Sequence, residues 1–317
     1  MQEQMQTTCT ICKRRNATYS RRYSGERLCS RCFCHSIEKK TRATIAKYEM
    51  LRFDDRIAIG LSGGKDSVTL LNILDKLEDS FPKTTLFAVT VDEGIKGYRD
   101  EALRIAEKSC QKLGIEQVIV SFKELFGYNL DEIVERLRER KTEHSSTTPC
   151  AYCGVLRRRA LNIAAQNCGA TRLATAHNLD DENQTLLLNI MHGDLFRMGR
   201  ARSISPSNSA HFVQRIKPFC EILEKETTFY AFLKGIEFQN TPCPYSSAAL
   251  RNDIRNMLNK MEEKHPGLKY TLYHSAEKLK SLITDASNTE VLTACEICSE
   301  PSANEICQPC KILLELK

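Results

Sequence analysis

Residues 56–77 constrain the fold of this chain more than any other segment. An apolar strand candidate at 56–61 leads directly into Ser62-Gly63-Gly64-Lys65-Asp66-Ser67, and helical periodicity follows. Glycines at a strand-to-helix turn let backbone N–H groups approach an anion, and the helix N-terminus adds roughly half a positive charge. The segment therefore predicts a phosphate-binding loop at one edge of a parallel sheet.

The alternation of strand and helix continues along the chain. Strand candidates lie at 85–91, 117–120 and 172–176, and helical periodicity marks 98–113, 153–167, 181–191, 227–234, 248–264 and 275–282. This pattern predicts an α/β fold, a Rossmann-like parallel sheet with helices on both faces. Ligands of such sheets bind beyond the carboxyl ends of the strands. The candidate contacts there are Val91, Asp92, His177, Asp180 and Asp181.

Basic residues are concentrated at the start of the chain. Residues 1–56 hold 13 Lys and Arg against 6 Asp and Glu, whereas the remainder holds 33 against 34. A basic terminal module suits a polyanion such as nucleic acid, and a solvated basic face is the alternative. Polar loops are predicted at 140–149 and 197–210, and the second one is a candidate RNA contact.

The 15 cysteines indicate thiolate chemistry. No stretch has the ~20 apolar residues of a membrane span, and the start lacks a signal-peptide pattern, so we expect a cytoplasmic protein without disulfides. Four Cys-x-x-Cys pairs have the spacing of two structural zinc sites. These are Cys9, Cys12, Cys29 and Cys32 at the front, and Cys295, Cys298, Cys307 and Cys310 at the back. Cys34 or His35 could replace Cys32, although the spacing favours Cys32.

Three further cysteines form a candidate reactive centre. Cys150 and Cys153 stand at the start of a helix that also carries Arg157, and Cys243 lies between two prolines. Because helix N-termini and nearby cations lower thiol pKa values, we expect thiolates here. Three thiols without a fourth suit a [4Fe–4S] cluster with one open iron, and persulfide transfer without metal is the alternative. Cys34, Cys110, Cys168 and Cys220 are left over and are expected to be small buried side chains.

Taken together, these motifs resemble the PP-loop two-thiouridine synthetases, the family of the tRNA 2-thiolation proteins. The matching segments are Leu28-Cys-Ser-Arg-Cys-Phe33, Ser62 to Ser67, Val91-Asp-Glu-Gly-Ile-Lys-Gly-Tyr-Arg-Asp100, Cys150-Ala-Tyr-Cys-Gly-Val-Leu-Arg-Arg-Arg159, His177-Asn-Leu-Asp-Asp181, Cys243-Pro-Tyr245 and the terminal cysteine pairs. On this resemblance Ser62, Gly63, Gly64 and Ser67 cradle the pyrophosphate of ATP, Lys65 neutralises it, and Asp66 positions Mg²⁺ or a proton. The cluster cysteines become Cys150, Cys153 and Cys243, the active-site aspartate Asp181, and the basic residue after the second cysteine Arg157.

The resemblance also implies a reaction and partners. It implies an ATP-dependent tRNA sulfurtransferase that adenylates uracil O2 at wobble position 34 and then replaces that oxygen with sulfur. The implied partners are tRNA, a ubiquitin-related modifier with a C-terminal thiocarboxylate, and a paralogous non-catalytic subunit, with a homodimer left open and no membrane. The expected parts are a zinc-binding basic module (1–50), the PP-loop catalytic domain (51–240), a helical extension with the third cluster cysteine (241–290) and a second zinc module (291–317).

Two other functions compete with this interpretation. A PP-loop amide or amidine synthase, of the lysidine or nucleotide synthetase type, would need no central cysteines. A non-catalytic zinc RNA-binding protein would need no intact phosphate loop, which counts against it here.

Overall fold

A five-stranded parallel sheet forms the centre of the fold. The computed structural model describes residues 8–78, 83–140, 148–194, 198, 203–205, 211–246, 250–286 and 293–316. The strands are β3 (Arg56–Gly60), β4 (Thr85–Asp92), β5 (Glu116–Ser121), β6 (Arg172–Ala174) and β7 (Gln214–Ile216), in the spatial order β5-β4-β3-β6-β7. The order reverses between β3 and β6, and a crevice for ligands forms at the carboxyl ends beside such a reversal. The predicted α/β class is confirmed.

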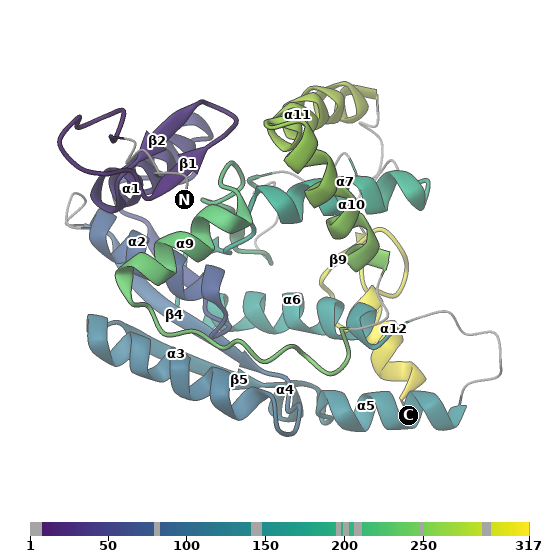
Figure 1. Cartoon of the computed structure of the whole chain (residues 1–317). Coiled ribbons are helices and arrows are strands. Elements are labelled where there is room, and N and C mark those ends of the chain that lie inside the picture. Colours follow the sequence, from purple (N-terminus) through teal and green to yellow (C-terminus); the bar gives the residue numbers. More distant parts are fainter. Residues whose placement is uncertain are drawn as a thin grey trace.

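Helices cover both faces of this sheet (Figure 1). The helices of this part of the chain are α2 (Lys65–Glu78), α3 (Arg99–Leu113), α4 (Phe122–Phe126), α5 (Leu130–Arg140), α6 (Pro149–Asn167), α7 (Leu179–Met191), α9 (Glu224–Lys234), α10 (Leu250–Lys264) and α11 (Leu268–Ala286). Of these, α10 and α11 pack against α7. The right-handed crossovers that build β3-β4-β5 place α2 and α3 on one face, and the return to β6 places α6 on the other. Helix α6 starts four residues before its predicted start, because Pro149 occupies a first-turn position where proline is favoured. Helix α11 is longer than the predicted 275–282.

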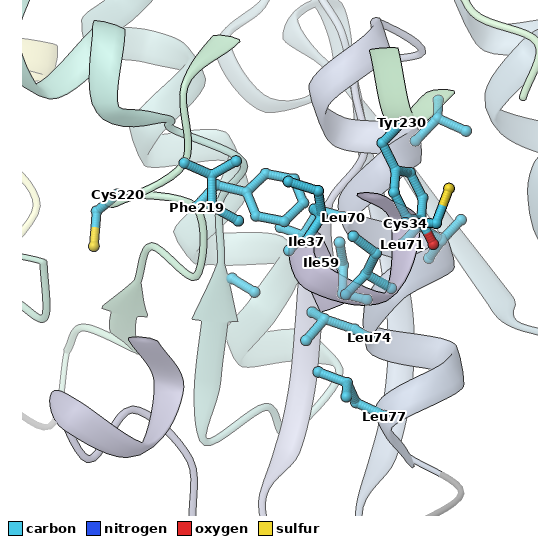
Figure 2. Packing of buried hydrophobic residues seen from close by; sticks show 14 of the residues in the cluster. Cys34, Ile37, Ile59, Leu70, Leu71, Leu74, Leu77, Phe219, Cys220 and Tyr230 are labelled. Carbon is cyan, nitrogen blue, oxygen red and sulfur yellow. The ribbon is translucent and has the colours of Figure 1, made fainter. Parts of the chain in front are cut away.

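The larger hydrophobic core joins the sheet to the N-terminal module. Leu70, Leu71, Leu74 and Leu77 are spaced as one face of α2, and Figure 2 shows them near Ile59 of β3 and Ile37. Ile37 belongs to α1 (Ser30–Lys47), which follows the hairpin β1 (Tyr19–Arg21) and β2 (Glu26–Leu28). The front module therefore packs into the main core.

A second core lies beside the C-terminal module. It contains Tyr152, Cys153, Leu156 and Ala160 of α6, together with Ile312 and Leu316. Ile312 belongs to α12 (Gln308–Glu315), which follows the short strands β8 (Thr293–Ala294) and β9 (Pro301–Ser302). Figure 1 shows this yellow module well away from the purple front module.

The structure also bears on the predictions for membrane spans, spare cysteines and loops. None of the helices in the described part of the chain combines the length and the apolar character that a bilayer crossing needs. Cys34, Cys110 and Cys220 are buried and Cys168 is half-buried, as expected for packing residues. The predicted loops at 140–149 and 197–210 lie mostly outside the described residues. The four domain boundaries stay predictions.

Candidate functional site

A pocket of about 580 Å³ opens where the strand order reverses. One wall is the loop after β3, and the opposite wall is the segment after β6, including Ala176 and His177. The lining from the predicted set comprises Ser62, Gly64, Lys65, Asp66, Ser67, Val91, Arg157, His177 and Asp181. The fold thus brings residues from distant parts of the sequence to one crevice.

The loop itself has the shape of an anion cradle. The Ser62 N–H donates to Ser67 Oγ at 3.1 Å, and the two hydroxyls lie 3.0 Å apart. Gly63 has φ +81°, and a Cβ there would stand 2.4 Å from the Ala102 carbonyl oxygen, so only glycine fits. Arg99 donates a hydrogen bond to the Ser62 carbonyl at 2.8 Å, which fixes the start of the loop.

Lys65 is held between two carboxylates at the start of α2. Its Nζ lies 2.8 Å from Asp66 Oδ2 and 2.8 Å from Glu224 Oε1. Burial lowers the pKa of Lys65, but Asp66 and Glu224 raise it further, so the net shift is upward and the ammonium stays charged. The Thr227 hydroxyl donates to Asp66 Oδ1. Helix α9 therefore orients both charged residues of the loop.

Asp181 is fixed by the first turn of α7. Its backbone N–H donates to Asn178 Oδ1 at 3.1 Å, and its carboxylate accepts the Asn178 N–H at 3.2 Å, which forms a capping box. Burial raises the pKa of Asp181 to about 7, aided by the negative charges of Asp66 and Glu224. A carboxyl with such a pKa can exchange a proton near neutrality.

His177 faces the same pocket as a neutral ring. Burial lowers its pKa to about 3, with further lowering from Lys217, Arg215, Arg251 and Arg158. Its Nδ1 lies 3.0 Å from the Thr175 hydroxyl. His177 is therefore a polar, uncharged contact for a ligand rather than a cation.

An ion network around the buried Glu93 connects the pocket to the central thiols. Glu93 lies 3.0 Å from Arg99 and 2.5 Å from Arg157, and its side chain is 3% exposed. Arg157 lines the pocket and donates to Cys153 Sγ at 3.1 Å. The phosphate pocket and the thiols are thus two ends of one site.

The central thiols are close together, yet their protonation differs from the expectation. The Cys150 thiol donates to the Tyr245 carbonyl at 3.2 Å, which places the loop of Cys243 beside α6. Burial raises the pKa of Cys153 to about 11 and also raises that of Cys150, although Arg157 acts in the opposite direction. The expected lowering at the helix N-terminus was wrong, because burial outweighs the cation.

These three sulfur atoms do not form a single-ion site. They are not all within 4.8 Å of one another, unlike the terminal sets. One zinc ion with Zn–S bonds of about 2.3 Å holds its sulfurs about 3.8 Å apart. An iron–sulfur cluster binds each thiolate at a different iron and so suits wider spacing. The triad fits a cluster better than one ion.

The two terminal sets fit a single tetrahedral ion. In each, four sulfur atoms lie within 4.8 Å of one another, with Cys12 and Cys29 at 3.9 Å and Cys298 and Cys307 at 3.6 Å. Burial raises the pKa of Cys9, but backbone hydrogen bonds lower it to about 6. At Cys295 the hydrogen bond from the Cys307 N–H is the main cause of a pKa of about 6. Both sets can hold a metal, as their spacing predicts.

Three predicted nucleotide contacts lie outside the pocket. Asp180 forms a buried ion pair with Lys269 and accepts the Glu224 N–H at 2.7 Å, so its carboxylate ties α7 to α9 and α11. Asp92 accepts the Gly94 N–H at 2.8 Å and shapes the turn after β4. Gly63 packs against Ala102 beneath the loop.

The pocket also has residues that the sequence prediction missed. Glu93 and Arg99 stand inside the segment 91–100 that carried the resemblance, so a signal for them existed. Arg251 of α10 lines the pocket, and Glu224 and Thr227 of α9 contact Lys65 and Asp66, which line it. Arg251 donates to the Thr185 hydroxyl at 2.9 Å, and its Nη1 lies 3.7 Å from Asp181 Oδ1.

Comparison with known proteins agrees with this site. A family model described as the PP-loop domain matches residues 34–262. The tRNA 2-thiolation protein NcsA of Haloferax volcanii is 37% identical over 96% of this chain and 98% of its own. The cytoplasmic tRNA 2-thiolation protein 1 of Laccaria bicolor is 34% identical over 96% of this chain and 84% of its own.

A solved structure matches the whole fold. The U34-tRNA thiolase NcsA of Methanococcus maripaludis, determined with its [4Fe–4S] cluster, has a TM-score of 0.82 and 32% identity, covering 97% of this chain and 96% of its own. The sheet order, the phosphate loop and the family match together define a PP-loop protein. Within that class, the chain belongs to the family of the tRNA 2-thiolation proteins.

Proposed function

We propose that the chain is an ATP-dependent tRNA sulfurtransferase that forms 2-thiouridine at wobble position 34. One observation carries this proposal: Arg157 lines the phosphate pocket and donates to Cys153 at 3.1 Å. Adenylation and sulfur transfer need an activated uridine next to a sulfur carrier, and this contact joins the two functions in one site. Relatives named for tRNA 2-thiolation support the same reaction.

In the first step uracil O2 attacks the α-phosphorus of ATP and pyrophosphate leaves. The loop N–H groups and Lys65 stabilise the negative charge that develops on the leaving group. Asp66, oriented by Thr227, is the carboxylate that positions Mg²⁺. Adenylation at O2 releases the proton of uracil N3, and Asp181, with a pKa of about 7, accepts it.

In the second step a sulfur atom at the oxidation level of sulfide attacks C2, the C2–O2 bond breaks, and AMP leaves with the former O2. Asp181 then returns the proton to N3. A [4Fe–4S] cluster with one open iron, held by Cys150, Cys153 and Cys243, would supply the sulfur at this position. Arg157, paired with Glu93, stays charged beside the departing phosphate. Zinc in the two terminal Cys₄ sites has a structural role, because neither set leaves a coordination position open.

The partners follow from this chemistry. The substrate is tRNA, and the basic N-terminal module is the surface that meets it. A ubiquitin-related modifier with a C-terminal thiocarboxylate is the proposed sulfur donor, and a paralogous non-catalytic subunit and a homodimer remain part of the proposal. The proposed location is the cytoplasm, as in the names of the fungal relatives.

Single replacement of Cys150, Cys153 and Cys243 by Ser tests this function. We expect 2-thiouridine formation to be lost in each variant, while tRNA-dependent release of AMP persists through hydrolysis of the adenylate. Cys168→Ser is the matched control, because Cys168 is a half-buried thiol at the end of the same helix α6. A wild type that releases AMP but forms no 2-thiouridine, with AMP release unchanged in all three variants, would favour an amide or amidine synthase. A wild type without tRNA-dependent AMP release would favour a non-catalytic RNA-binding protein.

Metal analysis tests the cofactors. Protein purified without oxygen should contain about two zinc and four iron per chain, as the ligand counts require. Zinc without iron would favour persulfide transfer at the central thiols.

A further inference from the structure

The C-terminal Cys₄ module docks on the helix that carries two central thiols. Cys153, Tyr152, Leu156 and Ala160 of α6 share one buried hydrophobic cluster with Ile312 and Leu316, which are 2% and 0% exposed, and α12 packs against α6. Cys153 is 6% exposed in this arrangement. The cluster that contains Cys153 therefore includes residues from the last 24 described positions of the chain.

A polar contact links the metal ligands themselves to α6. Arg159, only 16% exposed, donates to Cys310 Sγ at 3.4 Å, and its Nε lies 3.6 Å from Glu300 Oε1. Arg159 stands seven residues after Tyr152, which is two helical turns along the same face. A guanidinium beside a metal-bound thiolate offsets its charge, so this contact is strongest when the metal is present.

The C-terminal Cys₄ set and the start of α12 share two cysteines. Cys307 is the N-cap of α12 and Cys310 lies in its first turn, so metal binding fixes the helix start. The module has only two two-residue strands besides this helix, and so small a unit needs its metal to fold. Arg136 of α5 adds a hydrogen bond to the Leu316 carbonyl at 3.2 Å, which fixes the other end of α12.

We propose that the C-terminal module is a metal-dependent clamp on α6, in which Arg159 and α12 keep Cys153 shielded from solvent. Arg159 is then a positioning residue, since it acts through Cys310 and α12 and does not touch the substrate. Loss of metal from the C-terminal set opens the cover and exposes the central thiols. The part of this inference that concerns retention of a cluster rests on the proposed function, whereas the shielding of Cys153 does not.

Alkylation of Cys153 in the full chain, freed of iron but not of zinc and mapped by mass spectrometry, tests the clamp, because a thiolate bound to iron is not alkylated. Arg159→Ala should raise the rate about tenfold, because it removes one hydrogen bond to a charged group. Cys310→Ser should raise it further and lower the zinc content by one ion per chain. Arg158→Ala is the matched control, since Arg158 is the exposed neighbour on the same helix, and it should leave the rate unchanged.

Iron retention is the second readout. In anaerobic protein challenged with a chelator, Arg159→Ala should lose iron several-fold faster than wild type or Arg158→Ala, and Arg159→Lys should be intermediate. Equal alkylation rates in wild type, Arg159→Ala and Cys310→Ser would overturn the clamp, as would an equal rise in Arg158→Ala. If wild type binds no iron, the cluster assignment of the proposed function fails, and the alkylation rates still decide the clamp.

Discussion

The two terminal Cys₄ modules have the same ligands and the same compact geometry, but they support different halves of the site. The front module packs against α9 through Arg21 and Glu226, a buried pair 2.8 Å apart, and Glu224 of the same helix contacts Lys65. The rear module packs against α6, the helix of Cys150 and Cys153. The two Cys₄ sets thus lie beside different helices of the site, α9 at the front and α6 at the rear.

The two modules differ in net charge as well as in position. The first 56 residues have a net charge of +7, whereas residues 291–317 hold two Lys against four Glu. A polyanion is attracted to the first and repelled by the second. We infer that the front module serves nucleotide and tRNA, and that the rear module serves sulfur.

The largest expected effect is on AMP release, from a change in the phosphate loop that should leave the central thiols unaffected. Lys65→Ala should reduce tRNA-dependent AMP release roughly 10²–10³-fold, because it removes a preorganised cation at the leaving pyrophosphate. The same variant should keep wild-type iron content and wild-type alkylation of Cys153. Lys76→Ala, at the exposed end of the same helix α2, is the control. Normal thiolation by the Lys65 variant would contradict both the assignment and the division into halves.

The buried pair that holds the front module should give the next largest effect. Glu226→Gln removes one of the two carboxylates on the buried Arg21, since Glu26 also lies 2.9 Å from its guanidinium. The loss should be about 3 kcal/mol of unfolding free energy, the lower end for a broken buried pair. Urea denaturation measures this loss, and the Michaelis constant for ATP should rise because α9 carries Glu224 and Thr227. Glu237→Gln, in an exposed pair with Lys108, should barely move the denaturation midpoint. A larger rise in Cys153 alkylation than in the ATP constant would show that the modules do not act separately.

The rate of adenylation should depend on pH through Asp181, which lines the phosphate pocket. Because the pKa of Asp181 is about 7, the rate of adenylation should rise about tenfold per pH unit below 7 and level off above it. Asp181→Asn should lower the rate and remove this dependence. The sign for stability is opposite: a carboxyl whose pKa is raised by folding binds more protons in the native state, so the fold loses stability as pH rises through 7. A flat profile in wild type would exclude Asp181 as the proton acceptor.

The smallest expected effect concerns a thiol that belongs to neither module. Cys110 is 2% exposed in the main core, and Cys110→Ala should cost about 1 kcal/mol of unfolding free energy by leaving a small cavity. Zinc, iron and thiolation activity should remain at wild-type levels. Loss of any metal in this variant would mean that the division of the cysteines among sites is incomplete.

The sequence predicted those parts of the site that lie close together along the chain. The loop from Ser62 to Ser67 and both Cys₄ sets depend on local spacing, and the structure has each of them. Prediction failed where packing decides: it expected Asp180 in the pocket, but Lys269 of α11 binds its carboxylate. It also expected low thiol pKa values at Cys150 and Cys153, where burial dominates.

The sequence by itself thus determined the fold class, the phosphate loop, the metal-binding spacing and the family, because turns, caps and Cys-x-x-Cys pairs are formed by neighbouring residues. Only the tertiary structure decided that Glu224 meets Lys65, that Glu93 joins Arg99 to Arg157, and that Arg159 reaches Cys310. Such pairs join residues 6 to 159 positions apart. These pairs form only when the helices pack against a shared core, and no local sequence pattern specifies how the helices pack.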